Sequence, residues 1–160
     1  KTSIYKHFAS TSVLLEAVID READLISFGL PHEPADAFAY WEALKSYGAN
    51  LLDLLNRPDV IRLDQLMHEQ ARRHPGLGRR FFDATYGRCL RELEAILLYG
   101  SDRGFIRQPI AVAQEAELLL SMWEGFAFGR ARLCLTELPF PDPRGWAEAC
   151  VNRLFPADVW

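Results

Sequence analysis

The chain has 160 residues, of which 49% are hydrophobic and 12% are aromatic, and its formal net charge is −4. This length and apolar content suffice for one sizeable core, and no apolar run approaches the roughly 20 residues that a membrane-spanning helix needs. The first eight residues contain two lysines and no acid, whereas the remainder is acidic, so DNA binding by bulk attraction is excluded and any such binding is expected at the N-terminal part.

The first predicted element is a helix over residues 1–8. Ile4 and Phe8 lie four positions apart and therefore share one helix face. The remaining surface carries groups that can bond phosphate oxygens and base edges, from Thr2, Ser3, Tyr5, Lys6 and His7. The spacing by itself fits an ordinary amphipathic helix end as well as a DNA-reading helix.

Residues 1–15 resemble the helix-turn-helix signature of the tetracycline-repressor (TetR) family of transcriptional regulators. That signature runs small-Thr-aliphatic-Tyr-x-His-Phe and then x-Ser-Lys-Glu-x-Leu. The chain departs from it where the family usually has lysine and glutamate, at Thr11 and Ser12, and matches it in register at Thr2, Ser3, Ile4, Tyr5, His7, Phe8, Ser10 and Leu14. The resemblance implies that two helices of the family pattern, expected before Lys1, are absent from this chain. It also implies that residues 1–8 form a recognition helix whose DNA contacts are Thr2, Ser3, Tyr5, Lys6 and His7.

Helical periodicity continues along the rest of the chain. Apolar residues recur at helical spacing over residues 10–28, 35–56, 58–74, 75–100, 110–135 and 144–155, and most of these segments are separated or opened by prolines or glycines. The sequence has no alternating strand pattern of useful length. We therefore predict an all-α fold, with the end of a helix-turn-helix domain over residues 1–29 and an α-helical ligand-binding and dimerisation bundle over residues 30–160.

A second resemblance lies in this body. The stretches Ala-Arg-Arg-His-Pro-Gly-Leu at residues 71–77 and Asp-Arg-Gly-Phe-Ile at residues 102–106 are similar to the AefR-like subgroup of the same family. The family implies a ligand-responsive transcriptional repressor in the cytoplasm, which binds operator DNA as a homodimer and is released by a hydrophobic small-molecule effector. The alternative is an all-α small-molecule or lipid binding protein that does not bind DNA.

The predicted helix over residues 110–135 is apolar on almost every face, so it must be buried on almost every face. A stripe of small residues along it, at which another helix can approach closely, consists of Ser121, Gly125 and Gly129. Cys150 and Leu154 share one face of the last helix. We expect a dimer in which these two helices pair with their copies, as the family implies. A central helix of a monomeric bundle would show the same pattern.

Aromatic residues and methionine on successive predicted helices can line an apolar cavity between them. The predicted ligand-binding residues are Trp41, Met67, His68, Tyr86, Trp123 and Phe126. A solid aromatic core would bring the same side chains together, so the expectation of a cavity follows from the family resemblance.

No catalytic, metal or cofactor site is expected. The four histidines lie in separate segments, and His68-Glu69 lacks the second histidine of a zinc motif because Arg72 stands in its place. The arginine-rich run between residues 72 and 91 is expected to form solvated helix ends. An odd number of cysteines without metal-ligand spacing favours buried thiols in a reducing cytoplasm, at Cys89, Cys134 and Cys150. We therefore expect a protein that is not an enzyme.

Overall fold

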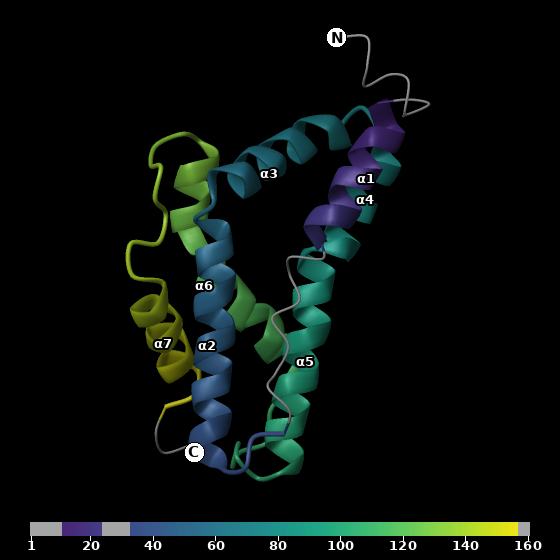
Figure 1. The fold of residues 1–160 in the computed structure, drawn as a ribbon. Coiled ribbons are helices and arrows are strands. Elements are labelled where there is room, and N and C mark those ends of the chain that lie inside the picture. The colour runs from purple at the N-terminus through teal and green to yellow at the C-terminus, as the bar shows by residue number, and fades with distance from the viewer. Residues whose placement is uncertain (1–10, 24–32, 157–160) are drawn as a thin grey trace.

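The structure is a computed structural model that describes residues 11–23 and 33–156, and every regular element within these ranges is a helix (Figure 1). The helices are α1 (Thr11–Ala23), α2 (Ala37–Leu55), α3 (Pro58–Ala71), α4 (Pro75–Ala84), α5 (Tyr86–Asp102), α6 (Val112–Arg132) and α7 (Pro143–Leu154). The predicted all-α fold is confirmed. No helix in these ranges combines the length and apolar character that crossing a bilayer requires.

Helix starts follow from local chemistry. Asp36 precedes α2, and its carboxylate accepts a hydrogen bond from Ala39 N at 2.8 Å. Asp142 caps α7 in the same way through Gly145 N at 2.9 Å. A proline occupies the first turn of α3, α4 and α7, where its missing N–H leaves no helical hydrogen bond unmade.

Most of the body packs around one large cluster, the main core, which α2, α5, α6 and α7 build together (Figure 1). Its fully buried members include Tyr40, Leu44, Leu93, Trp123 and Val151. The polar atoms of the aromatic residues are satisfied there: the Tyr40 hydroxyl donates to Ile96 O at 3.2 Å, and Trp123 Nε1 donates to Ala147 O at 3.2 Å.

A second, smaller cluster joins α1 to α3 and α4. This α1 cluster consists of Leu15, Ile19, Met67 and Leu77, with Leu63, Phe81 and Ala84 packed against it. Figure 1 shows α1 lying along α4, at one end of the molecule. On the surface of this contact, Arg80 on α4 pairs with Asp20 on α1 at 2.9 Å.

Two helices differ from the prediction. The segment 75–100, predicted as one helix, is broken at Thr85, where φ is −113° and ψ is −88°, into α4 and α5. The Thr85 hydroxyl donates to Phe81 O at 2.7 Å, a local bond that competes with continuation of the helix. The long helix α6 is kinked at Gly125, whose φ of 46° only glycine adopts readily. Phe126 follows the kink and is 88% exposed.

Candidate functional site

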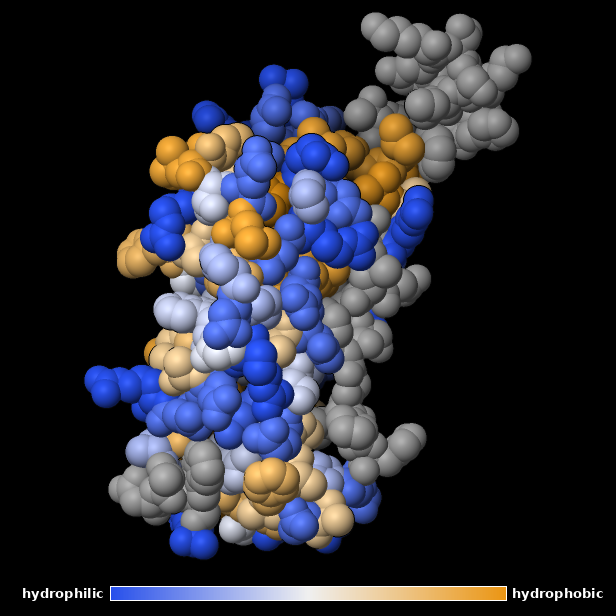
Figure 2. All heavy atoms as spheres, turned by 60° about the vertical axis from the view of Figure 1, so that its left-hand side comes forward, coloured by the Kyte–Doolittle hydropathy of each residue, from blue (hydrophilic) through white to orange (hydrophobic). Residues whose placement is uncertain are grey.

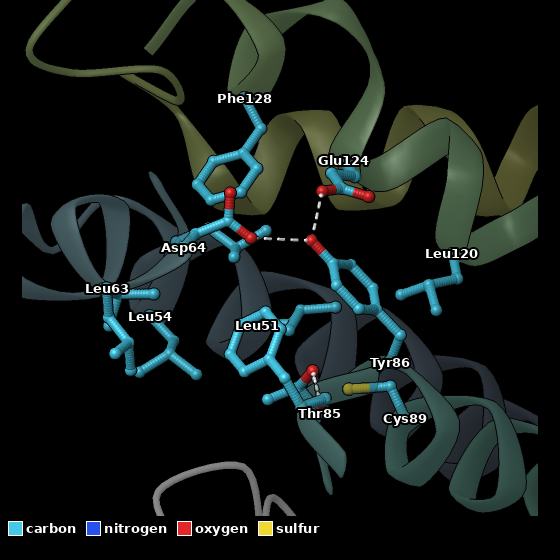
Figure 3. A pocket seen from close by; sticks show the side chains of 13 residues that line it. Leu51, Leu54, Leu63, Asp64, Thr85, Tyr86, Cys89, Leu120, Glu124 and Phe128 are labelled. Carbon is cyan, nitrogen blue, oxygen red and sulfur yellow. Dashed lines mark hydrogen bonds between the residues drawn. The ribbon is translucent and has the colours of Figure 1, made fainter. Parts of the chain in front are cut away.

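An apolar cavity of about 70 Å³ lies between the main core and the α1 cluster, where α2, α3, α4, α5 and α6 meet (Figure 3). Aliphatic and aromatic side chains make up most of its wall. The lining residues are Leu51, Leu54, Leu55, Val60, Leu63, Asp64, Phe81, Thr85, Tyr86, Cys89, Leu120, Glu124 and Phe128.

Local sequence explains how this wall is assembled. Leu120 and Glu124 are spaced four apart and share one face of α6 before the kink at Gly125, and Phe128 lines the cavity from the part of α6 after the kink. The break at Thr85 ends α4 and starts α5 beside the cavity, so that Tyr86 enters it from the first turn of α5.

The polar groups of the cavity converge on the hydroxyl of Tyr86. This hydroxyl lies 3.0 Å from Asp64 Oδ1 and 3.2 Å from Glu124 Oε1, and it accepts a hydrogen bond from Arg132 Nη2 at 2.6 Å. Figure 3 shows the hydroxyl between the two carboxylates, with Leu51 and Leu120 on either side of the ring. The cavity surface is therefore almost wholly apolar, and this polar cluster borders it.

Arg132 neutralises part of this charge. Its Nη2 also donates to Glu124 Oε1, and its Nε lies 2.7 Å from Asp64 Oδ2. The Asp64 side chain is only 5% exposed, so a nearby cation is needed to stabilise its ionised form. His68 adds a further contact, because its Nδ1 lies 2.8 Å from the backbone oxygen of Asp64.

Burial shapes the protonation of the groups in this wall. It raises the pKa of Glu124, because the carboxylate is poorly solvated there, and Arg132 and Tyr86 only partly offset this effect. Burial also moves the pKa of the Tyr86 hydroxyl well above its usual range, so the phenol remains a hydrogen-bond donor. The pKa of the Cys89 thiol rises to about 11 for the same reason, which makes this cysteine a poor nucleophile.

Of the six predicted ligand-binding residues, Tyr86 alone lines this cavity. Trp41 and Trp123 are buried in the main core, and Met67 is buried in the α1 cluster. His68 is exposed beside Asp64, and Phe126 points outward after the kink. The two tryptophans fill space in the main core, whereas leucines are the most frequent residues of the cavity wall.

The sequence prediction missed the two acids of the site, Asp64 and Glu124. Each stands in a helical stretch next to apolar residues, and Glu124 directly follows the buried Trp123. An acid at a position that helical spacing places near the core is a signal that could have identified both, because an ionised carboxylate is rarely buried without a partner.

The predicted dimer residues lie on α6 and α7. Ser121 and Gly125 are exposed, Gly129 and Leu154 are half-buried, and Cys150 is buried in the main core. Large apolar side chains are exposed around them, at Leu118, Phe126, Leu133 and Trp146. Figure 2, which faces the α7 side, shows apolar patches set among polar ones.

The predicted DNA contacts lie outside the described residues: Thr2, Ser3, Tyr5, Lys6 and His7. Among the predicted solvated arginines, Arg79 and Arg88 each pair with an acid four residues further along the same helix, and Arg73, in the turn after α3, pairs with Glu69. No group of three or more histidine, cysteine or acidic side chains with metal-binding geometry occurs in residues 11–23 and 33–156.

Comparison with known proteins gives two matches. Residues 42–154 match the family described as the C-terminal domain of the AefR-like transcriptional repressor. The fold is similar to the 1.54 Å crystal structure of a protein from Mesorhizobium loti MAFF303099 that is assigned to the TetR family of transcriptional regulators. The TM-score is 0.69 and the sequence identity is 19%, over 96% of this chain and 77% of that one. No curated protein matches the chain in sequence.

Proposed function

This chain belongs to the TetR family of transcriptional regulators, with an AefR-like C-terminal domain, and we propose that it is a ligand-responsive repressor. In this proposal it binds operator DNA as a homodimer in the cytoplasm and is released when a hydrophobic small molecule enters the cavity. Residues 1–29 supply DNA binding, through Thr2, Ser3, Tyr5, Lys6 and His7, and residues 30–160 bind the effector and the second subunit.

The position of the cavity is the observation that supports this proposal best. Leu63 and Phe81 line the cavity and also pack against the α1 cluster. A ligand that displaces either side chain therefore disturbs the packing of α4 on α1. Since α1 directly follows the proposed recognition helix, such a movement would alter the placement of the DNA-binding part.

The energetics set one requirement. The effector must bind the conformation that does not bind DNA more tightly than the one that does, because a ligand with equal affinity for both shifts no equilibrium. A cavity of about 70 Å³ is much smaller than the roughly 300 Å³ or more of common ligand sites. An effector of ordinary size must therefore open the cavity, which gives it the required preference for a rearranged state.

The exposed apolar surface of α6 and α7 supports the dimer. Phe126 is 88% exposed and Leu133 is 72% exposed, and large apolar patches on a folded protein commonly mark an interface. We expect Phe126→Glu to convert the dimer to a monomer in size-exclusion chromatography with light scattering. The matched control is Phe38→Glu, because Phe38 is 76% exposed but lies on α2. A Phe126→Glu protein that stays dimeric would contradict this interface.

DNA binding is tested by gel retardation with the protein expressed from its complete gene and DNA from upstream of that gene. We expect Tyr5→Ala to abolish retardation while light scattering shows an unchanged oligomeric state. If the Tyr5→Ala protein still retards the DNA at the concentration at which the wild-type protein does, the proposed recognition helix is contradicted. The same assay then tests release by any compound that native mass spectrometry finds in the purified protein.

A further inference from the structure

Two carboxylates of the cavity wall, those of Asp64 and Glu124, share one neighbouring guanidinium, that of Arg132, which does not itself line the cavity. Asp64 and Glu124 both reach the Tyr86 hydroxyl, and Arg132 contacts all three groups. With both carboxyls ionised, this set carries one excess negative charge. His68 offsets the excess only when it is protonated, and its side chain is 58% exposed.

The same carboxylates also lack hydrogen-bond donors. Asp64 Oδ2 is buried and lies 2.7 Å from Nε of Arg132, in an ion pair that does not have the geometry of a regular hydrogen bond. Tyr86 has one hydroxyl hydrogen for two carboxylate oxygens at 3.0 and 3.2 Å, so it can serve only one of them at a time. Within the described residues, Glu124 receives its hydrogen bonds at Oε1, which leaves Oε2 available.

A protonated amine meets both shortages, because it brings one positive charge and up to three N–H donors. A carboxylate ligand would add a like charge beside Asp64 and Glu124, and an alcohol would supply a donor without the charge. Burial raises the pKa of Glu124 and so disfavours the excess negative charge. Uptake of a proton and binding of a cation both remove that charge.

We propose that the effector of this regulator is a small amphiphilic amine whose ammonium group binds between Asp64 and Glu124 and whose apolar tail enters the leucine-lined part of the cavity. That this amine acts as an effector rests on the proposed ligand-responsive function. The preference of the cavity for an ammonium head group does not depend on that function. An alkyl tail too large for the cavity has to displace lining side chains. Leu63 and Phe81 are the ones whose displacement reaches the α1 cluster.

The test is calorimetric titration of the protein with hexylamine, hexanol and hexanoate, which share one tail and differ in head group. We expect hexylamine to bind at least about tenfold more tightly than either of the others, which corresponds to about 1.4 kcal/mol. Its affinity should also rise with pH as Glu124 loses its proton, because a proton on Glu124 competes with the ammonium.

The variant Glu124→Gln is expected to reduce the affinity for hexylamine about tenfold and to leave that for hexanol nearly unchanged. Its matched control is Glu117→Gln, an exposed position on the same helix outside the cavity wall, which should bind hexylamine as the wild type does. Circular dichroism checks that both variants fold.

Hexylamine binding that is absent, or no tighter than that of hexanol or hexanoate to the wild-type protein, overturns the amine proposal without recourse to any variant. An unchanged affinity in a folded Glu124→Gln protein also overturns it. Failure of the proposed function has a different signature, namely no retardation of upstream DNA by the protein from its complete gene, and it leaves the calorimetric ranking of the three head groups intact.

Discussion

The main core and the α1 cluster differ in size and in the number of helices that support them. Among the residues that the structure describes, the main core contains 24 buried residues, whereas the α1 cluster contains four. Because the free energy of burial grows with the apolar area removed from water, the smaller cluster holds its helices together much more weakly. The cavity lies between the two regions. A ligand that expands it is therefore expected to displace side chains of the α1 cluster more easily than side chains of the main core.

This comparison has a consequence for a ligand-responsive protein. Segments that must move are expected to have few buried contacts, while the surrounding body stays folded. The residues shared between the cavity wall and the α1 cluster, Leu63 and Phe81, lie where the two regions meet. Three experiments measure how different the regions are.

The largest effect is expected in the main core. Trp123 is fully buried, stacks on Tyr47 with ring centroids 6.1 Å apart and donates to Ala147 O. Replacement by alanine should lower the free energy of unfolding by about 3–5 kcal/mol in urea denaturation, because it leaves a large cavity and removes a buried hydrogen bond. The control is Leu98→Ala on α5, where the side chain is 52% exposed. Equal losses of unfolding free energy in the two variants would contradict the interpretation that Trp123 lies in a densely packed core.

A smaller and more local effect is expected for Ile19→Ala in the α1 cluster. Ile19 is fully buried, and its loss should cost about 2 kcal/mol, at the low end for such changes because few neighbours surround it. Hydrogen exchange should show faster amide exchange in α1 and unchanged exchange in α2 and α6. Val13→Ala on the same helix, where the side chain is 44% exposed, is the control. Acceleration spread evenly over all helices would mean that the two regions unfold as one unit.

The smallest effect is expected for the surface pair that connects α1 to α4. Arg80 and Asp20 form a hydrogen-bonded ion pair, with side chains that are 45% and 61% exposed. A double-mutant cycle with Asp20→Ala and Arg80→Ala should give a coupling energy of about 0.2–1 kcal/mol that decreases at high salt. A coupling well above this range would show that charge, and not the four buried residues, fixes α1 in place.

Much of the fold could be predicted from the sequence because helix formation depends on local patterns. The starts at Pro58, Pro75 and Pro143 follow from the residues that stand there. The break at Thr85 and the kink at Gly125 could not be predicted with confidence from the sequence. Both positions also fit inside a helical pattern, so the pattern by itself does not show that the backbone is non-helical there.

Less of the candidate site than of the fold could be predicted from the sequence. Tyr86 was predicted to bind a ligand and lines the cavity, whereas Trp41, Met67, His68, Trp123 and Phe126 lie elsewhere. The sequence by itself determined helices and family membership, because periodicity and motif spacing are properties of consecutive residues. Only the tertiary structure decided where the cavity lies and that Asp64, Glu124 and Arg132 meet at the Tyr86 hydroxyl. A cavity is space left unfilled by several helices at once, and no single stretch of the chain specifies it.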